Sequence, residues 1–354
     1  MSLKTDILIV GQGLAGTLLS YQLYKNKIHH LVIDKPSSNS ASKVAAGLIN
    51  PIGIKRMVKS WNVDLFLPYA HSLYQEMEQF LEASFFHPKL MDKIYGEKDK
   101  QFWQHRLGKG LLHDYIDPDP KNDLLSKNIL APYGYGQIKK GARLDMLTFL
   151  KAYRSFLNKS KLLIEDDFND KDLQIFDKSV HWKNIEASKV IFCRGEKDSL
   201  SPIFTLLNFR NTKGELLDIE LPNLKLKNIL LKGIFILPVE KDLYKMGATF
   251  EHEWNNLNPT PNKKQELLDK WASISTLQPK IIQHLTGIRP TMHDRRPVLG
   301  FLPENPSIGI FNGLGSRGSL LAPYLSHQFA LLLKEKTDQI FKEVKVERYF
   351  KQSN

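Results

Sequence analysis

Apolar residues recur along the chain in patterns that predict alternating strands and helices. Short, nearly continuous apolar runs at 6–10 (DILIV) and 30–33 (HLVI) predict buried strands. Apolar positions at helical spacing predict helices over 64–81 and 144–157. Between 208 and 254, apolar and polar residues alternate as in half-buried strands, which predicts a separate sheet. The chain therefore has the pattern of a mixed α/β protein.

A glycine-rich turn follows the first predicted strand and opens a helical pattern. In this turn Gly11 permits a sharp bend, Gly13 lets the backbone approach a pyrophosphate, and Gly16 lets the helix pack closely on the strand. The second predicted strand ends at Asp34, whose carboxylate is placed to accept hydrogen bonds from a ribose diol. These features predict a dinucleotide site. The alternative is a glycine turn without a ligand.

A second glycine-rich turn lies near the carboxyl end. Residues 308–311 predict a strand, 312–319 a turn and 320–334 a long apolar helix, which repeats the first arrangement. The run of small residues at 40–51 could lie against a flat ligand. We expect the first turn to hold the pyrophosphate of an extended cofactor and the second its ring system. The alternative for the second turn is close helix packing alone.

Size and composition limit the possible classes of protein. The 354 residues, 42% of them hydrophobic, suffice for one large or two modest domains. No segment reaches the roughly 18 consecutive apolar residues of a membrane span, and the first strand is too short for a signal peptide, so we expect a cytoplasmic protein. Cys193, the single cysteine, excludes intrachain disulfides and thiolate clusters, and no metal-ligand spacing occurs. We expect no metal.

The chain is basic, with a formal net charge of +12. Such a charge favours polyanionic partners, including tRNA. The lysines are spread along the chain, however, so a generally basic surface explains the charge equally well.

Several short motifs follow one another in an order that is more specific than any one of them. In chain order they are GQGLAG (11–16) with Asp34, AAGLINP (45–51), GARLD (141–145), CRG (193–195), GATFE (247–251), GIRP (287–290) with Asp294, PVLG (297–300) and GLGSRGSLLAP (313–323). With these motifs the chain resembles the FAD-dependent amine and amino-acid oxidoreductases of the D-amino acid oxidase superfamily. Within it, the chain is most similar to glycine oxidase and to the FAD domain of the bifunctional enzyme that matures the tRNA wobble uridine.

The resemblance implies a fold. We expect an α/β, Rossmann-like FAD-binding domain of the glutathione-reductase type from residues 1–85, 141–205 and 285–354. Residues 86–140 and 206–284 should form an interleaved α+β substrate domain on a mostly antiparallel sheet. Since this fold uses the whole chain, we expect no methyltransferase domain like that of the tRNA enzyme.

The resemblance also implies cofactor contacts. The turn and helix start at 313–319 would stabilise the negative charge that develops on the flavin ring, and Arg317 would add positive charge. The expected FAD contacts are Gly11, Gly13, Leu14, Ala15, Gly16, Asp34, Lys35, Ser42, Ala46, Gly47, Gly195, Gly313, Gly315, Ser316, Arg317, Gly318 and Ser319.

Candidate substrate residues come from the same likeness. Arg289, in the GIRP motif, matches the arginine with which the family binds a substrate carboxylate, and a guanidinium offers a fixed fork for that purpose. The alternative is a structural salt bridge, for example to Asp294. Tyr244 and Phe235 could line the substrate face, although a core role is as plausible. Family members often have a tyrosine where this chain has Phe235, which weakens a simple glycine or D-amino acid assignment.

Three functions remain open at this point. The first is FAD-dependent oxidation of a C–N bond in a small amino acid or secondary amine, by hydride transfer to flavin. The second is the same oxidation on a modified tRNA wobble uridine, which the GLGSRG motif favours because glycine oxidase has its arginine at the position of Ser316. The third is a flavoprotein without turnover. The amine, the electron acceptor and the oligomeric state are left open.

Overall fold

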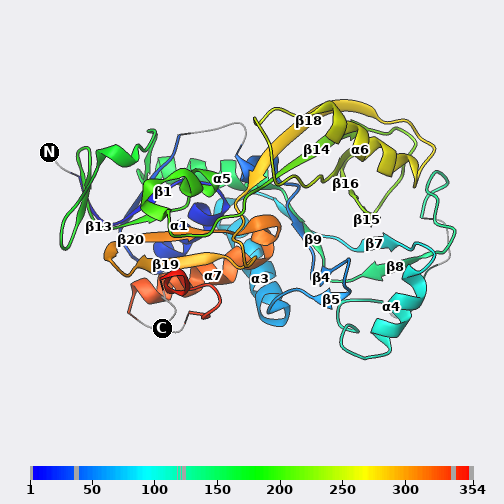
Figure 1. Cartoon of the computed structure of the whole chain (residues 1–354), viewed down its shortest axis with the longest axis horizontal. Helices are drawn as coiled ribbons and strands as arrows, with labels where there is room; N and C mark the ends of the chain where they lie inside the picture. Colours follow the sequence, from blue (N-terminus) through cyan, green and yellow to red (C-terminus); the bar gives the residue numbers. More distant parts are fainter. Residues whose placement is uncertain are drawn as a thin grey trace.

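Two β-sheets organise the molecule. The computed structural model describes residues 3–35, 40–117, 119, 121, 125–335 and 340–350. One sheet has eight strands and the other seven, and Figure 1 shows them at opposite ends of an elongated molecule, with both termini beside the eight-stranded sheet. The mixed α/β architecture is as predicted.

The eight-stranded sheet has a parallel centre extended by antiparallel strands. Its order is β10-β2-β1-β13-β12-β11, and β20 also pairs with β13 and with β19. Ile7 and Ile9 belong to one buried cluster and Leu8 and Val10 to another, so the central strand is covered on both faces, which explains its continuous apolar run. The strands are β1 (Leu3–Val10), β2 (His30–Ile33), β10 (Leu163–Ile164), β11 (Leu173–Ile175), β12 (Val180–Trp182), β13 (Ile185–Phe192), β19 (Val298–Leu302) and β20 (Asn305–Asn312).

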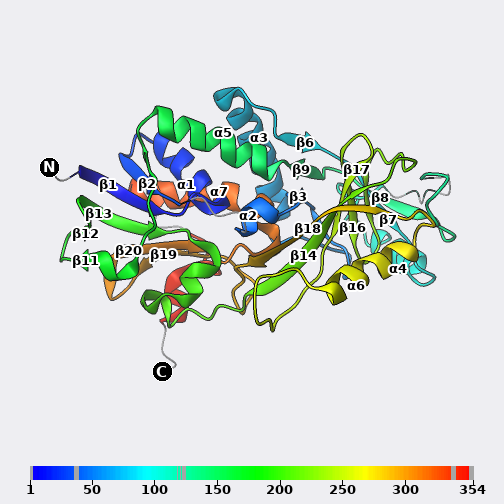
Figure 2. The ribbon, with the colours of Figure 1, turned by 90° about the horizontal axis from the view of Figure 1, so that it is seen from above.

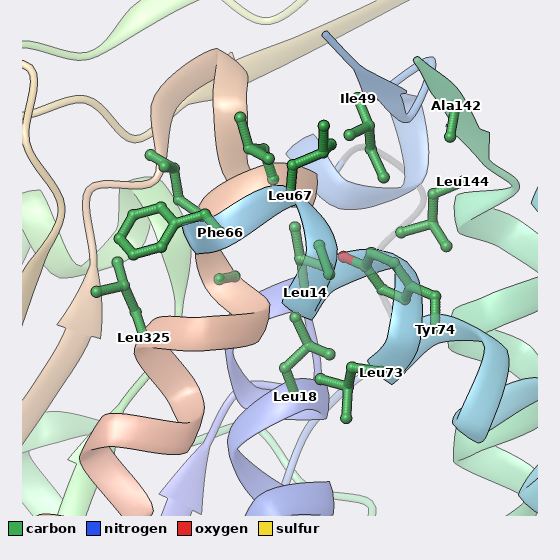
Figure 3. Close-up of a cluster of buried hydrophobic side chains, with 14 of the residues drawn as sticks. Leu14, Leu18, Ile49, Phe66, Leu67, Leu73, Tyr74, Ala142, Leu144 and Leu325 are labelled. Carbon is green, nitrogen blue, oxygen red and sulfur yellow. The ribbon is translucent and has the colours of Figure 1, made fainter. Parts of the chain in front are cut away.

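Four helices share the hydrophobic cluster on the Ile7 face of this sheet. They are α1 (Leu14–Lys25), α3 (Val63–Leu81), α5 (Met146–Lys159) and α7 (Gly318–Leu333), within one or two residues of the predicted bounds where these were given. Figure 2 shows α1, α5 and α7 side by side on the sheet. Figure 3 shows side chains of three of these helices in the cluster: Leu14 and Leu18 of α1 lie near Leu73 and Tyr74 of α3, and Phe66 of α3 lies near Leu325 of α7.

One buried hydrogen bond ties two of these helices together. The hydroxyl of Tyr74 donates to the carbonyl of Ser319 at 2.9 Å, which fixes the first turn of α7 against α3. Because the start of α7 is the second glycine-rich turn, this contact also positions that turn.

The seven-stranded sheet is antiparallel except for one parallel pair, β15 with β7. Its order is β18-β14-β17-β16-β15-β7-β8, and α6 (Pro261–Ala272) covers one face through Leu267 and Trp271. The expected boundary at 284/285 falls inside β18, which continues to Arg289. The strands are β7 (Met91–Ile94), β8 (Tyr135–Ile138), β14 (Thr212–Glu220), β15 (Ile229–Leu231), β16 (Phe235–Glu240), β17 (Leu243–Gly247) and β18 (Lys280–Arg289), with helix α4 (Asp99–Leu107) nearby in sequence.

Short elements connect the two sheets. Helix α2 (Ala41–Val44) packs on β18, where a Cβ placed on Gly287 would lie 3.3 Å from Val44 Cβ. The remaining elements are β3 (Leu48–Ile49), β6 (Phe86–Pro88) and β9 (Ala142–Leu144) in a small sheet, the hairpin β4 (Ile52–Gly53) and β5 (Val58–Lys59), and the 3₁₀ turns η1 (Asp170–Asp172), η2 (Gly195–Leu200), η3 (Pro202–Phe204), η4 (Gly315–Arg317) and η5 (Val346–Tyr349). Among the described residues, no helix is long and apolar enough to cross a membrane.

A buried histidine network makes the stability of this fold depend on pH. Ser20 Oγ lies 2.8 Å from both His30 Nε2 and the Tyr153 hydroxyl, and His30 Nδ1 lies 3.0 Å from the carbonyl of Ile28. Burial lowers the pKa of His30 below its usual value, so the unfolded chain binds a proton on this imidazole at a pH where the folded chain does not.

We therefore expect the midpoint of thermal unfolding to fall on acidification from pH 7.5 to pH 5.5, and to fall less in His30→Gln than in the parent protein. Circular dichroism during heating at each pH measures the midpoints. The other histidines are present in both proteins, so the difference between the two slopes reports the loss of His30. Identical pH dependence in parent and variant would contradict the assignment.

Candidate functional site

Two of the three glycines in the first turn are required by the packing of the protein itself. A Cβ on Gly16 would lie 1.9 Å from the carbonyl oxygen of Gly11. Gly11 has a φ of +103°, and a Cβ there would lie 2.7 Å from the carbonyl oxygen of Cys193. At Gly13 the nearest atom to a Cβ would be the flexible Ser42 Oγ, at 3.2 Å. A side chain at Gly13 would therefore meet one serine side chain and no backbone, so the absence of a side chain there fits close approach by a ligand.

The amino terminus of α1 presents free backbone donors at this opening. Gly13 is the N-cap residue and has no side chain with which to cap the helix. Ser42 Oγ accepts the Leu14 N–H at 3.0 Å, whereas the described residues provide no acceptor for the N–H groups of Gly13 and Ala15. Free donors and the positive end of the helix dipole form a binding site for anions such as a pyrophosphate.

Asp34 lies next to the turn and is held from two sides. Its Oδ1 accepts the Gln12 N–H at 2.9 Å, and its Oδ2 accepts from Arg154 Nη1 at 2.8 Å. The side chain remains 21% exposed, and each oxygen keeps a lone pair for a ribose hydroxyl. Lys35, in contrast, points toward Asp167 at 3.6 Å in an exposed ion pair.

Sequence reasoning missed Arg154 because nothing local marks it. It lies on α5, 120 residues beyond Asp34, and looks like an ordinary polar position of an amphipathic helix. Only the parallel pairing of β2 with β10, which follows α5, brings it to Asp34.

The second glycine turn lies against the first. Gly313 and Gly315 have φ values of +72° and +55°, and the Gly315 N–H donates to the Pro290 carbonyl at 2.8 Å. A Cβ on Gly318 would lie 2.9 Å from Leu14 Cδ2, so the starts of α7 and α1 are in close contact. No side chain caps α7, which leaves its first N–H groups available to a ligand.

The polar residues of the second turn differ in exposure. Ser316 and Arg317 are exposed, whereas Ser319 is buried. The Arg317 Nη2 lies 3.3 Å from the position of a Cβ on Gly53, which places the guanidinium beside β4. Partial removal from water and the charge of Arg296 lower the pKa of Arg317. These are the properties of a cation that an anionic ligand would stabilise.

The remaining predicted cofactor residues have local packing roles. Gly47 has a φ of +69°, and a Cβ there would lie 1.8 Å from the carbonyl oxygen of Leu144. Ala46, before it, is half-buried. Gly195 has a φ of +65° and its carbonyl accepts from Asn312 Nδ2 at 2.9 Å. Contact of these residues with FAD stays a prediction.

Arg289 is a half-buried cation without a carboxylate partner. Its guanidinium lies flat on Gly214, where a Cβ would lie 2.2 Å from Nη2. Nη1 donates to the Thr249 carbonyl at 3.2 Å, and the Phe250 ring lies 4.4 Å from Cζ. No carboxylate of the described residues lies within 4.0 Å, and burial lowers the pKa of Arg289 to about 10. An anionic ligand would offset this unpaired charge.

The suggested salt bridge between Arg289 and Asp294 does not form. Asp294 Oδ2 instead accepts from Arg348 Nε at 2.9 Å. Arg289 ends β18 just before Pro290, whose carbonyl holds the second glycine turn. The guanidinium and the expected ring-binding turn are therefore joined through one short segment.

The structure corrects the placement of Tyr244. Strand pairing places Arg289, Gly247 and Phe235 on one face of the seven-stranded sheet. Tyr244 points to the opposite face, where it is buried beneath α6 and its hydroxyl donates to the carbonyl of Leu224. Because successive strand residues alternate between faces, Tyr244 cannot share the Arg289 side. It is a core residue, whereas Phe235 faces the site.

Comparison with known proteins agrees with this geometry. The model of the DAO family, described as FAD dependent oxidoreductase, matches residues 6–332. The chain belongs to this family. It is an FAD-dependent oxidoreductase, and the alternative of a flavoprotein without enzymatic activity is set aside.

Alignments with sequence relatives cover most of the chain. The chain is 24% identical over 362 residues to the tRNA 5-methylaminomethyl-2-thiouridine biosynthesis bifunctional protein MnmC of Marinobacter nauticus, an alignment that covers 92% of this chain and 54% of that protein. The chain thus spans about half the length of this relative.

Two solved structures share the whole fold. Iminodiacetate oxidase from Chelativorans sp. BNC1 has a TM-score of 0.81 at 18% identity, covering 97% of this chain and 98% of that one. Glycine oxidase from Bacillus cereus has a TM-score of 0.78 at 18% identity, covering 94% and 96%.

The different demands on the turn glycines give a test. Gly13→Val should leave a folded protein that binds FAD at least tenfold more weakly, a loss of about 1.4 kcal/mol or more, because the new side chain fills the space in front of the free amides. Gly16→Val should instead disturb folding, since its side chain meets the Gly11 carbonyl. Flavin absorbance per protein and circular dichroism measure the two effects. Normal FAD content in folded Gly13→Val would refute the pyrophosphate assignment.

Proposed function

We propose that this protein oxidises the C–N bond of an amine that carries a carboxylate, and that Arg289 binds the carboxylate. The observation that supports this most is the half-buried guanidinium of Arg289, which has no carboxylate partner among the described residues. It lies on the face of the seven-stranded sheet that packs against α2, and Ser42 of α2 in turn contacts the first glycine turn. A carboxylate substrate would supply the missing partner in a charge-assisted, bidentate pair.

The residues around FAD have separable tasks in this proposal. The amides of Gly13 and Ala15 bind the pyrophosphate, and Asp34, held by Gln12 and Arg154, binds the ribose diol. The uncapped start of α7 and Arg317 stabilise negative charge on the ring system. When bound, FAD supplies the hydride acceptor for amine oxidation.

Arg289 would fix the substrate rather than act as an acid or base. Thr249 and Phe250 hold the guanidinium so that its remaining N–H groups can meet a carboxylate. An uncharged amine provides its own electron pair for hydride loss, so orientation is the main requirement on the protein. The structural neighbours named iminodiacetate oxidase and glycine oxidase support this, because both named substrates are amines with a carboxymethyl group.

Removing the Arg289 guanidinium should slow the oxidation of substrates that carry a carboxylate much more than that of substrates without one. In Arg289→Ala we expect flavin content to be retained and kcat/KM for an amino acid such as N-methylglycine to fall about 30-fold to several thousandfold, since a partly buried charged pair contributes about 2–5 kcal/mol. Arg289→Lys should recover only part of the loss, because an ammonium cannot reproduce the fork. Anaerobic flavin reduction measures the rates.

The matched control is the corresponding amine without a carboxylate, for which all three proteins should react at similar rates. Equal losses for the amino acid and the amine would mean that Arg289 supports the fold or the flavin, and would overturn the proposed role.

A second candidate substrate is a modified tRNA wobble uridine. Its support is the similarity, over 92% of this chain, to the Marinobacter nauticus MnmC protein, which is named for the biosynthesis of 5-methylaminomethyl-2-thiouridine in tRNA. The net charge of +12 suits a phosphate backbone. The exposed Phe250 ring at the Arg289 site offers a surface for stacking a base. The oxidised bond would still be a C–N bond, so the two candidates differ in the group attached to the amine.

Salt dependence distinguishes these candidates. If tRNA is the substrate, the dissociation constant of tRNA should rise steeply with salt, with a log–log slope equivalent to several phosphate contacts. Fluorescence anisotropy of labelled tRNA between low and physiological salt measures it. The reference is a polyanion without bases, such as heparin. Binding of heparin as tight as that of tRNA, or no tRNA binding at low salt, would exclude the tRNA candidate and leave the small amino acid.

A further inference from the structure

A second group of charged side chains lies buried on the face of β14 opposite Arg289. Lys213 and Glu215 are each 1% exposed, and Lys213 Nζ lies 3.2 Å from Glu215 Oε1. Glu251 Oε2 lies 3.8 Å from the same ammonium, and His284 Nε2 lies 2.8 Å from Glu215 Oε2. No cofactor or substrate role assigned above uses these groups.

Both members of the pair bind the same segment of chain, residues 249–260 between β17 and α6. Lys213 Nζ donates to the Asn258 carbonyl at 2.8 Å. Glu215 accepts from the Thr260 N–H at 2.9 Å and from the Thr260 hydroxyl at 3.1 Å. Thr260 is also the N-cap of α6, so these contacts fix the point where the segment becomes helix.

The other end of the segment is tied to the same two residues through the backbone. Lys213 and Glu251 exchange N–H···O hydrogen bonds of 2.9 Å in both directions. The Thr249 N–H donates to the Glu215 carbonyl at 3.1 Å, and the Thr249 Oγ1 accepts the Glu215 N–H at 2.9 Å. The segment is therefore fastened to β14 at both ends.

This fastened segment carries the contacts that hold Arg289. The Thr249 carbonyl accepts from Nη1, and Phe250 supplies the ring over the guanidinium. The Phe250 ring is 61% exposed, so little else fixes it in place. A buried ion pair is weak evidence for stability, because apolar residues of similar volume are often as stable. Apart from the contact of Glu215 with His284 on β18, the attachments of this pair are to the 249–260 segment, and positioning explains them better than stability does.

We propose that Lys213 and Glu215 are positioning residues, which fix the 249–260 segment so that Thr249 and Phe250 hold the Arg289 guanidinium ready for a substrate carboxylate. This inference rests on the function proposed for Arg289. It adds that the specificity for a carboxylate is set from the opposite face of the sheet, by residues that never contact the substrate.

The test is the double variant Lys213→Met/Glu215→Leu, because a single change would leave one buried charge unpaired and could prevent folding. The double variant should keep its flavin, and its kcat/KM for N-methylglycine should fall at least tenfold, mainly through a higher KM. The matched amine without a carboxylate should react nearly as in the parent. Hydrogen exchange at Thr249 and Glu251 should become faster.

Two further variants serve as references. Lys213→Met/Glu215→Gln leaves no buried charge unpaired, keeps an acceptor for Thr260 and should retain more of the selectivity than Lys213→Met/Glu215→Leu. Lys280→Met removes an ion pair with Glu220 between the same two strands at their far end, and should change neither rate nor exchange. In an Arg289→Ala background, the double variant should cause no further loss of selectivity.

The outcomes separate the two proposals. If Arg289→Ala loses selectivity for the carboxylate but the double variant does not, or if the double variant slows both substrates equally, the positioning role is wrong while Arg289 keeps its role. If Arg289→Ala itself affects both substrates equally, the proposed function fails and the positioning role fails with it.

Discussion

The close approach of helix α1 to strand β1 is the constraint on which the site depends. The Gly11 carbonyl occupies the space where Gly16 would carry a side chain, so the helix begins directly at the end of the strand. Gly318 at the start of α7 packs against Leu14 in the same way, because a side chain there would contact Leu14 too closely. The starts of α1 and α7, neither of which has a capping side chain at its N-cap residue, are thereby brought to one edge of the eight-stranded sheet. In the proposed function, their N–H groups and dipoles bind the extended anionic cofactor there.

The second requirement is that the seven-stranded sheet presents one particular face to this edge. Gly287 packs on α2, and the residues at every second position of β18 share its side, which brings Arg289 toward the cofactor turns. The Arg289 guanidinium packs flat against Gly214, which has no side chain in its way. Arg289 is thus held away from water without a carboxylate partner among the described residues, and in the proposed function a substrate carboxylate relieves this unfavourable charge.

Charge is used differently on the two sides of β14. On the face proposed to meet the cofactor, Arg289 has no ionic partner among the described residues, which suits a group that binds a substrate anion. On the opposite side, Lys213 and Glu215 are paired and saturated with hydrogen bonds to one segment. Burial makes both arrangements rigid, because a buried polar group that leaves its hydrogen-bond partner is destabilised. Rigidity rather than added stability is the expected benefit.

Local sequence determined the parts of this protein that depend on neighbouring residues. The sequence predicted the turn glycines, the position of Asp34 at a strand end and the bounds of the helices. These features depend on backbone dihedral angles and on hydrophobic periodicity, which act over a few residues. Tertiary structure alone decided the rest. The alternation of apolar and polar residues around Tyr244 shows which residues share a face of the strand, but not which face is buried. Only the packing of α6 decided that. Arg154 contacts Asp34, and Thr260 contacts Glu215, only once the strand order is set. Contacts between residues so far apart in sequence depend on how sheets and helices pack. They leave no pattern in the local sequence around either partner.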